Sequence, residues 1–61
     1  MNNNKPIILL SIYNLLNTNI KNTITSNVNI IDDSNYNIKA PSNLSLEKQE
    51  QVKNRILSQY K

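Results

Sequence analysis

The fold of this chain depends on one strongly apolar stretch, PIILLSIYNLL at residues 6–16. Proline is well tolerated in the first turn of a helix, so Pro6 can open one. At helical spacing, one face then collects most of the apolar side chains, namely Ile8, Ile12, Leu15 and Leu16, widened by Leu9 and Tyr13. We therefore predict a helix over residues 6–18. The alternative is a buried strand at 7–10, because periodicity does not separate the two structures in a short apolar run.

The segment after this stretch changes to a spacing of two residues. In TITSNVNII, residues 23–31, the side chains of Ile24, Ser26, Val28 and Ile30 alternate with Thr and Asn, as in a strand with one buried face. DDSN at 32–35 is typical of a turn, since these side chains bond the local backbone. YNIKA at 36–40 alternates again, and Pro41 ends it because proline lacks a backbone donor. We predict a β-hairpin over residues 23–40.

The C-terminal segment has the clearest helical pattern. Ser45 can act as N-cap, and Glu47 lies in the first turn, where negative charge suits the helix dipole. At 100° per residue one stripe collects the apolar side chains Leu46, Val52, Ile56, Leu57 and Tyr60. We predict a helix over residues 45–60.

Together these elements predict a small α+β fold, a helix–β-hairpin–helix unit that forms a single domain over residues 1–61. The alternative is a mostly α chain with an extended middle segment. A chain of this length buries only about 60% of the surface that its unfolded form exposes, and it has no Cys to form a disulfide. We expect the isolated chain to be poorly folded or self-associated, through a strand edge that carries no charge at Val28, Ile30 and Ile31.

The composition indicates a source with an AT-rich genome. Asn, Ile, Lys and Tyr supply 31 of the 61 residues, 13 of them Asn, whereas Ala and Arg supply one each and Gly is absent. The frequent residues use AT-rich codons and most of the depleted ones use GC-rich codons. Candidate sources are bacteria of this type with their phages or plasmids, organelles, and protists.

The residue types exclude most enzyme chemistry. Without His or Cys the chain lacks the commonest general base and the thiolate metal ligands, and without Gly it has no phosphate-binding loop. Asp33, Asn35 and Asn37 imitate the start of a calcium loop, but Ile38 and Leu44 occupy the positions that need Gly and Glu. We expect no catalytic residue, no cofactor, no metal and no small-molecule substrate.

The charge pattern argues against strong binding to nucleic acid. The net charge of +3 comes from seven basic and four acidic residues, and the basic ones are spread along the chain. A membrane role is also disfavoured, because the apolar stretch is about half of the roughly 20 residues that a spanning helix needs. No small-residue cleavage site follows it, so we expect the protein not to be secreted.

The function that fits these features is a non-enzymatic structural or accessory subunit of a larger assembly. We expect a small phage virion protein of the capsid or head–tail junction, located in the virion or the cytoplasm of a bacterial host. Its partners would be other subunits or further copies of itself. One alternative is a small basic regulator that binds nucleic acid or a host protein through a basic face on residues 45–61, formed by Lys48, Lys53, Arg55 and Lys61. The other is a short membrane-associated peptide that uses residues 6–20. The candidate interface residues are Ile8, Ile12, Tyr13, Leu16, Val52, Ile56, Leu57 and Tyr60.

Overall fold

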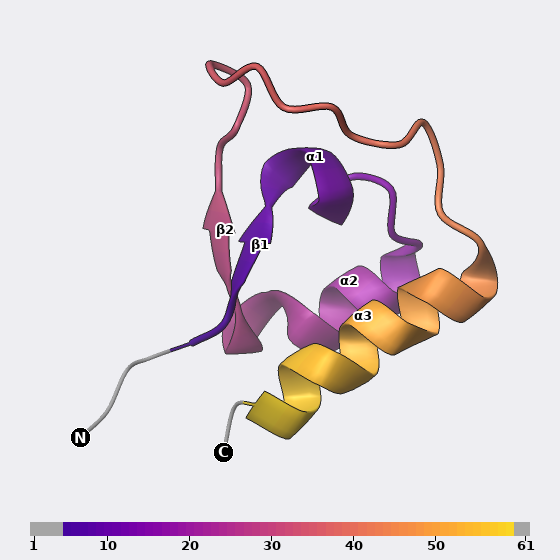
Figure 1. Cartoon of the computed structure of the whole chain (residues 1–61). Helices are drawn as coiled ribbons and strands as arrows, with labels where there is room; N and C mark the ends of the chain where they lie inside the picture. Colours follow the sequence, from indigo (N-terminus) through magenta and orange to yellow (C-terminus); the bar gives the residue numbers. More distant parts are fainter. Residues whose placement is uncertain (1–4, 60–61) are drawn as a thin grey trace.

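The computed structural model describes residues 5–59, and Figure 1 shows their arrangement. Two short strands and four helical segments follow one another along the chain: β1 (Ile7–Leu9), α1 (Leu10–Tyr13), α2 (Thr18–Ile24), the 3-10 turn η1 (Thr25–Asn27), β2 (Asn29–Ile31) and α3 (Leu46–Gln59). The predicted small α+β unit is confirmed, but its internal arrangement differs from a helix–hairpin–helix.

The predicted helix over residues 6–18 is wrong, because the apolar stretch divides into β1 and the single turn α1. β1 pairs in parallel with β2, with Ile7 opposite Asn29. The pairing begins where the Asn29 N–H donates to the Pro6 carbonyl at 2.8 Å. This partner satisfies backbone groups that a helix would otherwise pair locally, and it leaves the Ile8 side chain buried. The alternative of a strand at 7–10 describes this part of the chain better.

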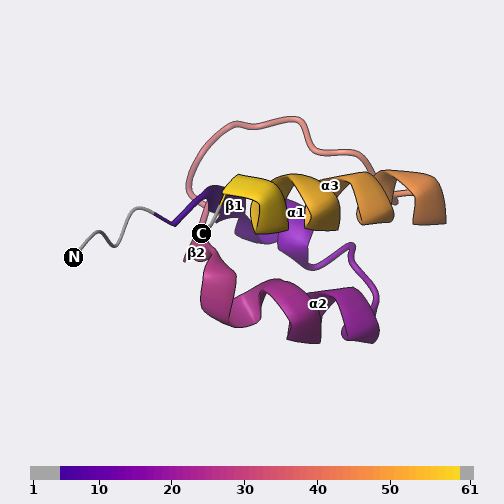
Figure 2. The same ribbon diagram turned by 90° about the horizontal axis from the view of Figure 1, so that it is seen from below.

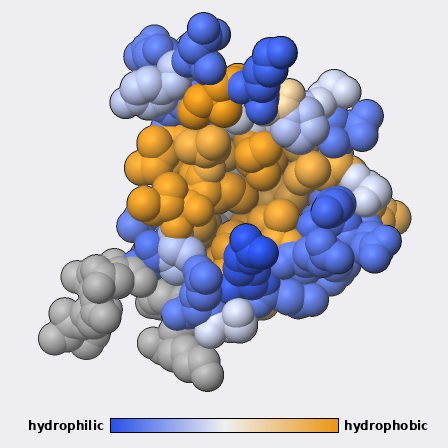
Figure 3. All heavy atoms as spheres, viewed as in Figure 1, coloured by the Kyte–Doolittle hydropathy of each residue, from blue (hydrophilic) through white to orange (hydrophobic). Residues whose placement is uncertain are grey.

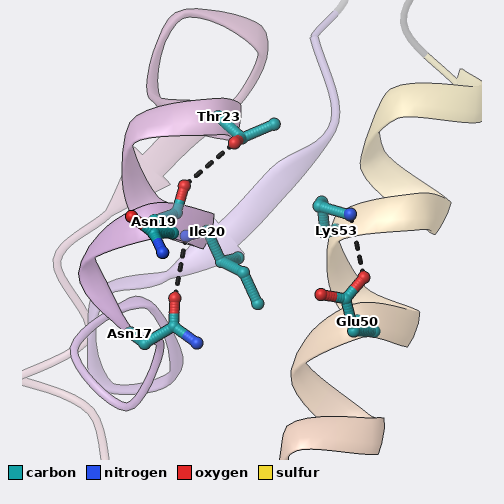
Figure 4. A network of polar contacts seen from close by, with 6 residues as sticks. All are labelled: Asn17, Asn19, Ile20, Thr23, Glu50 and Lys53. Carbon is teal, nitrogen blue, oxygen red and sulfur yellow. Dashed lines mark hydrogen bonds and ion pairs between the residues drawn. The ribbon is translucent and has the colours of Figure 1, made fainter.

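The predicted hairpin over residues 23–40 is also wrong, because its first half belongs to α2 and η1. The Asn17 side chain caps α2 by accepting the Ile20 N–H at 2.9 Å. One turn later the Thr23 hydroxyl donates to the Asn19 carbonyl (Figure 4). Residues 32–45 form neither helix nor strand, so no second hairpin strand exists at 36–40.

The predicted helix over residues 45–60 is confirmed as α3 within the described residues. The Ser45 hydroxyl accepts the Lys48 N–H at 3.2 Å, and Glu47 occupies the first turn. Its amphipathic stripe faces the rest of the chain, since Ile56 is buried and Val52 and Leu57 pack against the core.

The core lies between α2 and α3, which run on opposite sides of the molecule and contact each other across it (Figure 2). Ile20 points from α2 toward α3 (Figure 4), and Ile24 is completely buried. The buried apolar side chains are Ile8, Leu16, Ile20, Ile24, Val28 and Ile56. The helices between β1 and β2 form the crossover that a parallel strand pair requires.

Two buried polar side chains anchor the irregular segment 32–45. Gln49 on α3 accepts the Asn17 N–H and donates to the Leu44 carbonyl, both at 2.9 Å. Asp33 accepts the Ser11 backbone N–H at 3.0 Å and the Ser11 hydroxyl at 2.5 Å. Asp33 thereby caps the N-terminus of α1 from a distant part of the sequence. The residue at the N-cap position itself, Leu9, makes no capping hydrogen bond with its side chain.

The Asp33–Ser11 contact predicts a loss of stability in acid. The hydrogen bond from the Ser11 hydroxyl holds the pKa of Asp33 below its ordinary value of 3.8, although burial opposes this shift. The carboxylate therefore stabilises the fold fully above pH 3.8, and this contribution disappears as the pH falls through the lower pKa of the folded state. Asp32, whose pKa the Ser34 N–H lowers, titrates in the same range and adds to the decline.

We expect Asp33→Asn to be less stable than wild type at neutral pH and to lose less stability between about pH 5 and pH 2. Urea denaturation followed by circular dichroism at several pH values measures both effects. Ser34→Ala serves as the matched control, since it leaves the Asp33–Ser11 contact intact. An identical pH dependence for wild type and Asp33→Asn would contradict the assignment.

Candidate protein-docking groove

An apolar hollow of about 440 Å³ opens between β1, α1 and α3. Figure 3 shows hydrophobic side chains gathered on this face of the molecule, with hydrophilic ones around them. Seven apolar residues line the hollow, which we call the β1–α3 groove: Ile7, Ile8, Leu9, Ile12, Leu44, Val52 and Ile56. Its volume lies in the range of clefts that bind ligands or peptide side chains.

Cationic side chains of α3 form one side of the groove. Lys48, Gln51 and Arg55 are three and four residues apart, so they share one face of the helix. Lys48 and Arg55 are two turns apart, about 10 Å along the helix axis. In the part of the chain that the structure describes, the charged residues that line the groove are Lys48 and Arg55, with no acidic residue beside them, so its charge is positive.

The third cation of α3 has a partner within the helix. Lys53 forms an ion pair of 2.8 Å with Glu50 (Figure 4). Among residues 5–59, Lys48 and Arg55 form no salt bridge. The positive charge beside the groove is therefore available to an outside carboxylate.

The apolar surface continues from the groove across the two strands. Ile7 is 66% exposed although it borders the groove, and Ile31 on β2 is 41% exposed. Ile31 is the register partner of Leu9, so these two side chains lie on the same face of the sheet. Contiguous exposed apolar surface of this kind marks interaction sites in proteins.

Most of the interface residues predicted from the sequence pack in the interior of the protein. Ile8, Leu16 and Ile56 belong to the core, and Ile12, Tyr13, Val52 and Leu57 pack against it. Tyr60 lies outside the described residues. Four of the eight, Ile8, Ile12, Val52 and Ile56, also line the groove. Contact of these residues with another subunit stays a prediction.

The Tyr13 side chain packs against the core and also contacts residues of α2 and η1. Its hydroxyl lies 2.9 Å from the Thr25 hydroxyl, and the Lys21 ammonium lies 5.5 Å from the centre of its ring. Both contacts join α1 to the end of α2 and η1. Tyr36, by contrast, is 64% exposed in the irregular segment.

Sequence reasoning missed the groove itself, although it placed Lys48 and Arg55 on the basic face that the regulator hypothesis would use. Lys48 and Arg55 were interpretable from their spacing of seven, but the polar face of a helix is normally solvated. Ile7, Leu9 and Leu44 become groove residues only through the pairing of β1 and the position of the irregular segment. No local pattern marks them.

No described group of three or more His, Cys, Asp or Glu residues is placed to hold a metal ion. Within residues 5–59, every helix is too short or too polar to cross a lipid bilayer. Comparison of the chain with known protein families, curated proteins and solved structures gives no match.

Proposed function

We propose that this chain is a non-enzymatic accessory subunit of a larger protein assembly and contacts its neighbours through the β1–α3 groove. The observation that carries the proposal is Ile7, which is 66% exposed at the border of a 440 Å³ apolar hollow. Removing such surface from water contributes roughly 25 cal/mol per Å² of apolar area, against which the entropy lost on association is set. Because a chain of this length buries little apolar surface by itself, a partner that covers the groove also stabilises the fold.

The assembly that we favour is a phage virion, in the capsid or at the head–tail junction. Support comes from the AT-rich composition, with 13 Asn in 61 residues, and from the small size of the chain. The protein would then reside in the virion or in the cytoplasm of the bacterial host. The regulator and membrane-peptide hypotheses stay predictions, and the uncovered apolar face favours the subunit over both.

Site-specific photocross-linking in cells of the source organism tests this proposal. A benzophenone amino acid is placed at Ile7, which borders the groove, and in a matched variant at Leu46, which is 69% exposed and does not line it. After irradiation, the assemblies are separated by gradient sedimentation, and each adduct is identified by mass spectrometry.

We expect the position 7 probe to give one discrete adduct with a protein that sediments in a large particle, and the position 46 probe to give none. A chain that sediments alone and forms no protein adduct at position 7 would contradict the proposal. Cross-linking to nucleic acid at either position would favour the regulator instead.

A further inference from the structure

We propose that the β1–α3 groove takes an extended acidic segment of a partner protein, which pairs as a third strand with the free edge of β1. This inference rests on the proposed function and specifies the chemistry of the partner. Three features carry it: the accessible edge of β1, the apolar lining of the groove, and the two cations beside it.

Within residues 5–59 the sheet contains only β1 and β2, so no described strand pairs with the edge of β1 that faces away from β2. The Pro6 carbonyl points toward β2, because it accepts the Asn29 N–H. Backbone groups of successive strand residues point to opposite edges, so the Ile7 N–H and carbonyl face the free edge. Such unpaired groups are a template for an added strand.

The groove runs along this same edge. Side chains of successive strand residues point to opposite faces, yet Ile7, Ile8 and Leu9 all line the groove. A hollow beside the edge of the strand is reached by all three residues, whichever face their side chains point to, and this edge position accounts for the lining. An extended segment placed there reaches the backbone of β1 and the apolar side chains of α3 together.

The cations of α3 select the charge of the segment. Lys48 and Arg55 border the groove, form no salt bridge within residues 5–59, and face no acidic lining residue. Carboxylates that alternate with apolar side chains along a strand would meet these cations while the apolar ones enter the hollow. A basic segment would be repelled.

A second copy of this chain fits the groove less well. Two-fold pairing would place the positively charged groove of one copy against that of the other, because such an interface uses the same patch on both copies. The chain has four acidic side chains, and three of them are engaged: Asp32 with the Ser34 N–H, Asp33 with Ser11 and Glu50 with Lys53. Charge complementarity therefore favours a different protein.

Fluorescence anisotropy with two labelled peptides tests the inference on the full chain. One peptide alternates Glu and Val over eight residues, and the other has Lys in place of every Glu. The charge variants are Lys48→Glu, Arg55→Glu and their combination. Lys39→Glu is the matched control, because it changes the net charge equally but lies outside the groove. Circular dichroism verifies that each variant folds.

We expect saturable binding of the Glu/Val peptide to wild type and much weaker binding of the Lys/Val peptide. The combined reversal should weaken Glu/Val binding by about tenfold or more and invert the preference, since it replaces two attractions by repulsions. Equal binding of both peptides to wild type would overturn the proposal. A loss with Lys39→Glu as large as that with Lys48→Glu would also do so.

A second pair of variants tests strand pairing. Ile7→Ala removes the side chain and keeps the N–H at the free edge, whereas Ile7→Pro removes both and leaves the groups that face β2. Ile7→Pro should bind the Glu/Val peptide several-fold more weakly than Ile7→Ala. Equal affinities would refute the added strand.

Binding to phosphatidylserine vesicles without binding to either peptide would replace the protein segment by an anionic membrane surface. The outcomes also separate the two proposals. A protein adduct at position 7 combined with no charge preference means that the subunit function stands and the acidic strand does not.

Discussion

Ile24→Ala should lower the free energy of unfolding by about 2–5 kcal/mol, the usual cost of deleting a buried isoleucine side chain. Ile24 lies at the end of α2 and has no exposed surface. Its removal leaves a cavity among the side chains that hold α2 against α3. A domain of this size has little stability to lose, so we expect the variant to be largely unfolded in water.

Urea denaturation followed by circular dichroism measures this effect, with trimethylamine oxide added equally to all samples so that folded populations remain measurable. Ile24→Val should cost only about 0.5–1.5 kcal/mol. Thr23→Ala, at the neighbouring exposed position, should change stability by about 0.5 kcal/mol or less. Equal losses for Ile24→Ala and Thr23→Ala would mean that α2 does not dock through this side chain.

Ile56→Ala should also cost about 2–5 kcal/mol. Ile56 is 5% exposed and carries the apolar stripe of α3 into the core, where it also forms part of the groove. Its loss should therefore weaken both the fold and the binding of a partner. The same denaturation assay measures the first effect, and a repeat in the assembled state includes the second.

Gln51→Ala is the matched control on the same helix. Gln51 is exposed, so its replacement should change the stability of the isolated chain by less than about 0.5 kcal/mol. Equal effects of Ile56→Ala and Gln51→Ala would show that α3 is not held by this face. The proposed groove would then lose the wall that carries Lys48 and Arg55.

α3 was predictable because its signals are local. The Ser45 cap, Glu47 in the first turn and the stripe that includes Val52 and Ile56 all lie within one segment. Each acts on residues three or four positions away, so no other part of the chain is needed to interpret them. The structure places this helix within a residue of the predicted bounds at its N-terminal end.

The middle of the chain was mispredicted because its pattern fits two periods. Buried apolar residues recur at every fourth position, at Leu16, Ile20, Ile24 and Val28. Ile20 and Ile24 belong to α2. Ile24 and Val28 also belong to the alternation that suggested a strand. Asn17, whose side chain caps α2, was the one local signal that separates the two.

The groove also combines features that are visible in the sequence with one that depends on the tertiary structure. Lys48 and Arg55 share a helix face by their spacing alone, and the apolar character of residues 7–9 is plain in the sequence. Their proximity in space depends on how β1 docks beside α3. The sequence therefore does not reveal that these cations and apolar residues form one surface.

By itself, the sequence determined the amphipathic C-terminal helix and the lack of His, Cys and Gly, because these depend on composition or on neighbours within a few residues. Tertiary structure decided that Ile7–Leu9 extends as a strand, that its partner is Asn29–Ile31 in parallel, and that Asp33 caps α1. The physical reason is that a short apolar run satisfies its backbone equally well in a helix or a sheet. Only the distant segment that pairs with it, and the burial that results, selects one of them.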